Sequence, residues 1–254
     1  MTGLPRVFAR ACAAEWTRLW TVKATWWFLT AAVAVMVGIA TVASLEAAGS
    51  PDPTPGRSAW AAASITALPG QFALLAIALS AVTSDYATGG IVPSLQWTPR
   101  RAVLFGSRAV VAVVAATALG LLVSSAATLA SFVAARPLFT LDAAGAGAVL
   151  PDLAIVFAAG AAFALGLGFV LRNTAGTLVA VFLLMLVLPL VLPNFGFEWT
   201  ARVARLLPGS GAAHLLTGQV PGMTWASSVV TLVCWAAGAL LLGWLRLARD
   251  DADR

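Results

Sequence analysis

Six apolar runs, each about as long as a bilayer is thick, constrain the fold of this 254-residue chain more than any other feature. A helix needs about 20 mostly apolar residues to cross a hydrocarbon core of about 30 Å. The runs are rich in Ala, Leu and Val, and none contains a charged residue. We therefore expect six membrane spans, at about 25–45, 59–83, 109–135, 153–171, 174–192 and 225–245.

Composition supports the same class of protein. Hydrophobic residues make up 61% of the chain and charged residues only 10%, far from the balance of a soluble domain. We predict an all-α integral membrane protein, with residues 1–254 forming a single transmembrane domain. No compact basic soluble domain is present to bind nucleic acid.

The distribution of basic residues predicts the orientation, because cytoplasmic loops carry an excess of Lys and Arg. With a cytoplasmic N-terminus, an even number of spans returns the C-terminus to the same side. That side then holds Arg6, Arg10, Arg18, Lys23, Arg100, Arg101, Arg108, Arg172, Arg246, Arg249 and Arg254, against Arg57, Arg136, Arg202 and Arg205 outside. We therefore expect a multi-pass protein of the inner (plasma) membrane with both termini in the cytoplasm.

Two segments outside the spans have amphipathic patterns. Residues 4–23 place Phe8, Cys12 and Trp16 on one helical face and arginines on the other, which predicts an N-terminal helix lying in the membrane interface. Residues 194–224 combine short amphipathic pieces with a Pro208–Gly209 break. We interpret them as a short re-entrant helical segment on the outer side, before the last span.

The sequence excludes several kinds of chemistry. Lys23 is the only lysine and has no glycine-rich phosphate loop around it, so the chain cannot hydrolyse ATP by the P-loop route. His214 is the only histidine and the two cysteines lie far apart, so we expect no metal site. The span cores contain no ionisable residues, which argues against a proton-coupled carrier. We expect no catalytic residues and therefore no enzyme activity in this chain.

A polar stretch between the second and third spans, SDYATGGIVPSLQWTPRR (residues 84–101), has a more specific pattern. The Gly89–Gly90 pair is expected to end the helix of the second span, and Pro93 suits the start of a short new helix. Thr98–Pro99 would stop that helix before the arginines. The stretch thus predicts a short helix on the cytoplasmic side that could dock a partner.

This pattern resembles the cytoplasmic loop of type 2 ATP-binding cassette permeases, in which an acid and an aromatic precede a Gly pair, a short apolar helix, a Pro and arginines. The leader AAEWTRLWTVKATWW resembles the entrance helix of that family. Asp85 stands where the family often has Glu, and Ser107–Arg108 stands where an Ala–Lys ending is frequent. With six spans and a broken segment before the sixth, the resemblance extends across nearly the whole chain.

The resemblance implies a permease subunit that moves a hydrophobic drug, a lipid-like molecule or an antimicrobial peptide outward by alternating access. A separate cytoplasmic ATPase subunit would bind ATP and magnesium, and a second permease copy or a homologous permease would complete the transporter. The implied coupling loop is residues 84–108, and its coupling residues, with one from the entrance helix, are Glu15, Asp85, Tyr86, Thr88, Gly89, Gly90, Pro99, Arg100 and Arg101.

By the same resemblance the second and fifth spans should border the substrate path, which would expose Gln71, Phe72 and Leu75. Simple packing explains these three residues equally well. Two other functions stay open from the sequence: a gradient-driven carrier or channel, and a non-transporting scaffold or immunity protein that sequesters a toxic peptide.

Overall fold

The computed structural model describes residues 3–50, 55–97 and 100–249. Within them, six helical segments are long and apolar enough to cross a membrane, which confirms the predicted number of spans. Five are single helices and the fifth, in chain order, is built from several pieces. The six are α2 (Lys23–Ala48), α3 (Trp60–Thr88), α5 (Arg101–Ala134), α6 (Ala143–Leu171), the composite segment Thr174–Phe195 and α11 (Trp225–Arg249).

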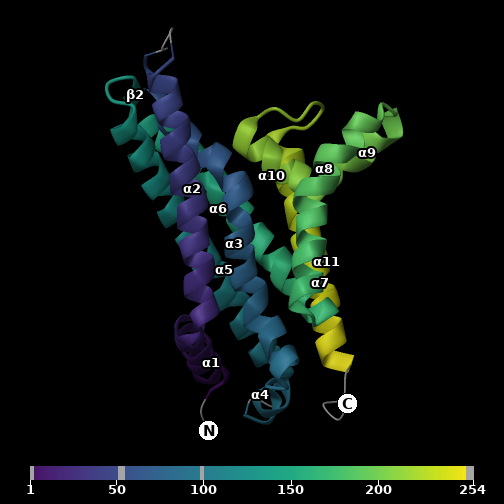
Figure 1. The fold of residues 1–254 in the computed structure, drawn as a ribbon. Coiled ribbons are helices and arrows are strands. Elements are labelled where there is room, and N and C mark those ends of the chain that lie inside the picture. The colour runs from purple at the N-terminus through teal and green to yellow at the C-terminus, as the bar shows by residue number, and fades with distance from the viewer. Residues whose placement is uncertain (1–2, 51–54, 98–99, 250–254) are drawn as a thin grey trace.

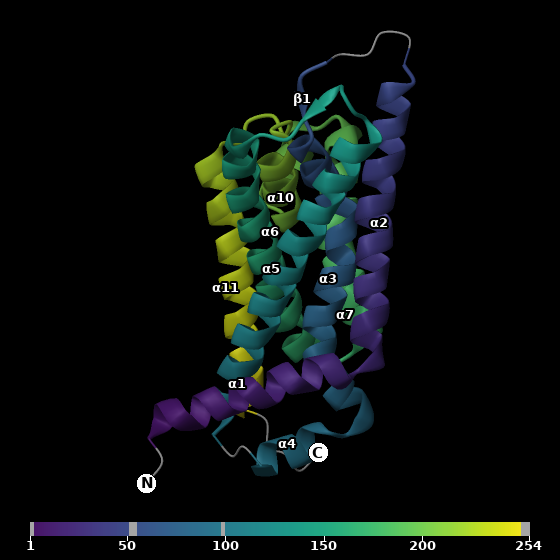
Figure 2. The ribbon, with the colours of Figure 1, turned by 90° about the vertical axis from the view of Figure 1, so that its left-hand side faces the viewer.

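The spans form a bundle with α3 and α6 at its centre (Figures 1 and 2). Helix α6 packs against α11, α3 and α5, while α2 packs against α3 and α5. The composite fifth span and α2 are the least buried of the six. Helix α1 (Leu4–Thr21) crosses one end of the bundle, and α11 ends at that same end (Figure 2).

Small residues allow the closest helix contacts, as the run AAGAAFALGLG (residues 158–168) in α6 predicts. A Cβ placed on Gly166 would lie 2.4 Å from the backbone carbon of Ala239 in α11. In α5, a Cβ on Gly120 would lie 2.4 Å from the ring of Phe157 in α6. These glycines therefore set how near α6 lies to its two neighbours.

The fifth span is not the continuous helix that residues 174–192 suggest. Helix α7 (Thr174–Phe182) leads into one turn of π-helix, η1 (Leu183–Val187), then α8 (Leu188–Val191) and a 3₁₀ turn, η2 (Leu192–Phe195). Pro189 has no N–H to donate to the carbonyl of Met185, four residues earlier, and the helix loosens at that point.

Shorter elements connect the spans. At the end opposite α1, β1 (Arg57–Ser58) and β2 (Phe139–Thr140) form a two-residue parallel pair. Helices α9 (Glu198–Arg205) and α10 (Pro208–Thr217) follow the fifth span at that end, and Figure 1 shows α8 and α9 splaying away from α10. Helix α4 (Ile91–Trp97) lies beyond the ends of the spans, near α1 (Figure 2).

Several helices extend past the predicted apolar cores. Helix α3 continues to Thr88 and α5 already begins at Arg101, so the connection predicted as residues 84–108 is shorter and contains α4. Polar residues can prolong a helix once it has left the hydrocarbon, which is why an absence of charge underestimates helix length. Helix α1 ends slightly before the predicted boundary of residue 23, because Val22 is extended.

Candidate functional site

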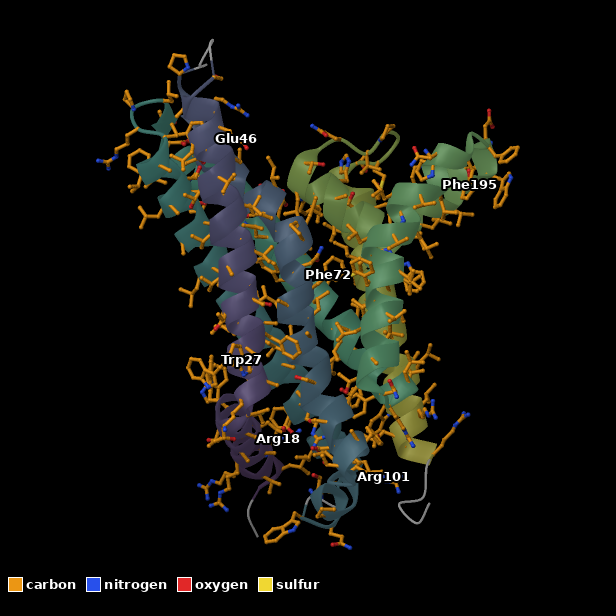
Figure 3. All side chains as sticks on the ribbon, viewed as in Figure 1. Arg18, Trp27, Glu46, Phe72, Arg101 and Phe195 are labelled. Atoms are coloured by element: carbon orange, nitrogen blue, oxygen red, sulfur yellow. The ribbon has the colours of Figure 1, made fainter. Side chains whose placement is uncertain are left out.

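Four charged side chains from three helices meet at the α1 end of the bundle, and we call them the charge cluster. Glu15 and Arg18 come from α1, Asp85 comes from the last turn of α3, and Arg108 comes from the second turn of α5. Figure 3 shows Arg18 at this end of the molecule, far from Glu46 and Phe195 at the other. The cluster contains two carboxylates and two guanidiniums, so its charges balance.

Arg108 is the centre of the charge cluster. Its Nε donates to Glu15 Oε1 at 3.0 Å and its Nη2 to Asp85 Oδ2 at 2.5 Å. Only 1% of the Arg108 side chain is exposed, against 13% for each carboxylate partner. A buried arginine of this kind needs paired acids, because an isolated charge is costly to remove from water.

Arg18 supplies the second cation. Its Nη1 lies 3.0 Å from Asp85 Oδ2 and its Nη2 lies 2.9 Å from Asp85 Oδ1, a two-pronged contact that suits a planar guanidinium. Nη2 also donates to the carbonyl of Ala81 at 2.7 Å. The charge cluster therefore fastens α1 to both α3 and α5.

A small cavity of about 70 Å³ lies beside the charge cluster. Glu15, Arg18 and Arg108 line it together with Ser80 and Ser84 of α3. The Nη1 of Arg108 is buried and has no hydrogen-bond partner among the described residues. The cavity is large enough for water.

Other predicted coupling residues lie near the charge cluster but have different contacts. The ring of Tyr86 lies under the guanidinium of Arg172, 4.7 Å away, at the turn between α6 and α7. Thr88 is exposed and donates to its own helix at the carbonyl of Ser84. Gly89 ends α3 with a φ of 72°, as the Gly pair predicts.

The two arginines after α4 that were predicted to be coupling residues, Arg100 and Arg101, differ in their contacts. Arg101 donates to the carbonyls of Leu247 and Ala248, at 3.0 and 2.9 Å, and so holds the last turn of α11. Arg100 is exposed and precedes the first residue of α5. Gly90 lies close to Asp85 and Thr88, while Pro99 falls outside the described residues.

The residues expected along a substrate path all lie on α3, and Figure 3 shows Phe72 midway along the bundle. Gln71 and Leu75 are buried, and the ring of Phe72 packs edge-on against Phe182 of α7 at 5.2 Å. Leu68, one turn before Phe72, lines a larger cavity toward α10, and Gln71, Phe72 and Leu75 do not. Phe72 and Leu75 therefore make packing contacts, and Gln71 Nε2 donates to the carbonyl of Leu68 in its own helix at 3.1 Å.

Sequence reasoning counted Arg18 and Arg108 among the cytoplasmic basic residues and placed Arg108 at the end of the coupling loop, but it did not foresee that they pair with Glu15 and Asp85. A signal for the pairing was present, since Glu15 and Asp85 are acids among many basic residues at one end of the chain's spans. Which arginines pair with these two acids depends on how the helices pack against one another. In the described ranges no three His, Cys, Asp or Glu side chains gather as a metal site would require.

Comparison of the sequence with models of known protein families and with curated proteins gives no match. The likeness to type 2 ATP-binding cassette permeases therefore rests on the order of its motifs. The structural features that bear on its function are the charge cluster, α4 and the arrangement of the spans.

Proposed function

We propose that the chain is the membrane-spanning permease subunit of an ATP-binding cassette exporter that moves a hydrophobic or amphipathic substrate outward by alternating access. A separate cytoplasmic ATPase subunit would bind ATP and magnesium and supply the energy. The observation that carries this proposal is α4, a short helix that lies beyond the ends of the spans and begins just after α3, the helix that carries Asp85 (Figure 2).

Helix α4 has the position and the surface of a docking element. Trp97 is its last residue and is 87% exposed, more than any other large apolar side chain of the described residues. Trp is common among the few residues that dominate protein interfaces. A large apolar side chain that extends from the membrane end of the bundle fits a cleft in a soluble partner.

The charge cluster would carry motion from that partner into the bundle. Helix α4 follows α3 after a two-residue turn, and Asp85 lies in the last turn of α3. A push on α4 would therefore act on Asp85, and through it on α1 and α5. Charged pairs that can exchange partners offer two discrete arrangements, as a switching element requires.

In this function α1 lies in the cytoplasmic interface, both termini are cytoplasmic and the protein resides in the inner membrane. Helices α9 and α10 form the re-entrant segment on the outer side. The poorly buried faces of α2 and the fifth span are available to a second permease copy and to lipid. Two facing copies would enclose the path that alternates its access.

Co-purification tests the proposed partner. The tagged protein is extracted from its native membrane in mild detergent, and mass spectrometry searches for a stoichiometric soluble subunit with a P-loop. We expect such a subunit with the unchanged protein and with the control Trp27→Ala, since Trp27 is an exposed residue of α2, away from α4. Trp97→Ala should reduce its recovery about ten-fold, as expected for loss of an interface hot spot.

The opposite results are equally informative. If intact protein repeatedly lacks such a subunit, a gradient-driven carrier or a non-transporting immunity scaffold becomes the better explanation. Transport into vesicles without ATP would then identify the carrier. If the subunit is present and Trp97→Ala retains it fully, α4 is not its docking element.

A further inference from the structure

A second feature lies at the opposite end of the molecule, between the fifth span and α10. A cavity of about 650 Å³ opens there, within the range of roughly 300–1,000 Å³ that is usual for small-ligand pockets. Its walls come from η1, α8 and η2 on one side and from α9, α10 and the loop 219–222 on the other. Most of the lining is apolar, including Met185, Leu186, Pro189 and Leu190.

The break in the fifth span makes this cavity. The Cα–H of Gly209, near the start of α10, faces the carbonyl oxygen of Met185, where a Cβ would come within 2.0 Å. This contact brings α10 against η1, while α8 and α9 turn outward beyond Pro189 (Figure 1). The space between the two arms is the cavity.

One charge enters this apolar space. Arg205, the last residue of α9, lines the cavity, and the described lining residues include no other charged side chain. Its guanidinium lies against Gly222, where a Cβ would come within 2.3 Å of Nη1. Arg205 has no ion pair and no hydrogen bond within the described residues. A guanidinium beside an apolar cavity is thus left to bind an anion.

Helix α9 also has the surface of a helix at the bilayer interface. Its exposed apolar residues Trp199 and Val203, with Leu206 directly after its last residue, follow one another at helical spacing and share a face. Phe197 and Trp199 stack at 6.4 Å and are both exposed. Aromatic side chains favour the headgroup level of a membrane, and an arginine on the same helix then lies near the phosphates.

We infer that this outer cavity binds an anionic phospholipid, with its phosphate on Arg205 and an acyl chain along the apolar wall from Met185 to Leu190. The charge of Arg205 selects a phosphate-bearing headgroup, and the lining selects a hydrocarbon chain. The inference deepens the proposed export function by naming the substrate class as phosphate-bearing amphiphiles, and it rests on that function only for the ligand's fate after binding.

Native mass spectrometry of the purified full chain in detergent tests the inference. Three probes are titrated: dioleoyl phosphatidylglycerol, dioleoylglycerol with the same chains but no phosphate, and glycerol 3-phosphate with no chains. We expect the unchanged protein to retain phosphatidylglycerol in clear preference to both others. Arg205→Gln should weaken that binding about ten-fold, the effect of losing a hydrogen bond to a charged group.

Arg202→Gln is the matched control. Arg202 lies one turn earlier on α9, pairs with Glu198 at 3.0 Å, is 69% exposed and does not line the cavity, so binding should be unchanged. Ala213→Phe keeps Arg205 but adds a ring to the α10 wall, and it should also weaken phosphatidylglycerol binding. Thermal unfolding of each variant shows that the fold is retained.

Three outcomes would overturn the inference. Equal binding by Arg205→Gln and the unchanged protein would show that the arginine does not hold the headgroup. An equal loss in Arg202→Gln would show only general surface charge. Equal retention of dioleoylglycerol or glycerol 3-phosphate would show that phosphate and chain are not recognised together. None of these readouts needs an ATPase or transport, so the binding site and the proposed function can fail separately.

Discussion

Arg108 illustrates how a single buried charge can join three helices. It is 1% exposed and contacts Glu15 of α1 and Asp85 of α3 from its place on α5. In water such pairs contribute little, but removing one partner of a buried pair leaves the other charge uncompensated. The charge cluster therefore has consequences for stability that exposed arginines at the same end lack.

Arg108→Met keeps an unbranched, flexible stem, shorter than that of arginine, and removes the guanidinium charge. We expect a loss of about 3 kcal/mol in the free energy of unfolding, the lower end for breaking a buried pair, because Arg18 still compensates Asp85. Titration with SDS in mixed detergent micelles measures this change in the free energy of unfolding. Arg100→Met is the control, since Arg100 is exposed, and it should stay within about 0.5 kcal/mol of the unchanged protein.

A double-mutant cycle separates the pair from other effects. If Glu15 and Arg108 interact as the 3.0 Å contact indicates, Glu15→Gln with Arg108→Met should cost clearly less than the sum of the single changes. Additive losses would mean that the Glu15–Arg108 contact contributes no coupling energy, and α1 would then be joined to the charge cluster through Arg18 alone.

A glycine in α6 and a glycine in α11 differ in how closely they approach a neighbouring helix. Gly166 faces the α11 backbone at a distance that excludes a methyl group, whereas a Cβ on Gly238 would meet nothing within 4 Å. The sequence identified a small-residue run in α6, but many of its members could have faced the partner helix. Only the packing of α6 against α11 selects Gly166.

Gly166→Ala and Gly238→Ala form a matched pair of variants. Gly166→Ala should reduce the free energy of unfolding by about 1–3 kcal/mol, the usual cost of overpacking, since two helix backbones would have to separate. Gly238→Ala should be neutral or stabilise by up to about 1 kcal/mol, because alanine favours a helix. Equal stability of the two variants would contradict the close α6–α11 contact. Unfolding in mixed micelles compares them directly.

The start of α6 has a carboxylate cap that links it to β1. Asp142 accepts from the backbone N–H of Gly145 at 2.7 Å and from Ser58 Oγ at 3.0 Å. The Gly145 contact first, and then Ser58, lower the pKa of the Asp142 carboxyl below its ordinary value. Stability from the ionised group is complete above the ordinary aspartate pKa of about 3.9 and is lost as the pH falls through the lowered folded-state pKa.

Two substitutions test this cap. Asp142→Ala should lower the Tm at pH 7, because the N–H of Gly145 loses its acceptor. Asp142→Asn can keep that acceptor, so its Tm at pH 7 should fall less, and the drop in Tm of the unchanged protein on acidification below about pH 4 should shrink in this variant. The same acid sensitivity in Asp142→Asn and the unchanged protein would assign the drop to other groups. Thermal scans across pH give both comparisons.

The elements divide into those that local sequence predicts and those that depend on packing. The number of spans and the helix end at Gly89 follow from apolar length and from a turn residue, and both are present. The π-turn in the fifth span was not foreseen. Pro189 removes a backbone hydrogen bond and so marks where that helix is weak. The π-helical turn at this place also depends on the close approach of Gly209, which lies twenty residues later in the sequence.

At the scale of the whole molecule, the two ends of the bundle differ in charge. The α1 end holds most of the described basic residues, including Arg18 and Arg101, which Figure 3 labels. Arg57, Arg136, Arg202 and Arg205 belong to the elements and connections of the opposite end. By the positive-inside rule, this asymmetry predicts which end of the folded bundle lies in the cytoplasm. We expect helix α4 and the charge cluster to face the cytoplasm and the cavity beside Arg205 to face outward.

Cysteine labelling in vesicles of known sidedness tests this orientation. Gln96→Cys in α4 and Thr140→Cys in β2 are exposed positions at opposite ends, and both changes leave the charge distribution untouched. They are made after Cys12 and Cys234 are replaced by alanine. In right-side-out vesicles a membrane-impermeant maleimide should label the Thr140→Cys variant at once. It should label the Gln96→Cys variant only after the membrane is permeabilised.

The reverse pattern would place α4 outside the cell, where no cytoplasmic ATPase could reach it, and would end the proposed function whatever the cavity binds. Partial labelling at both positions would indicate two orientations in one membrane. The basic residues of the α1 end come from the N-terminal helix, from the residues that follow α4 and from the end of α11. To invert the bundle, all of these groups would have to cross the bilayer together, which the membrane potential and the anionic inner leaflet both oppose.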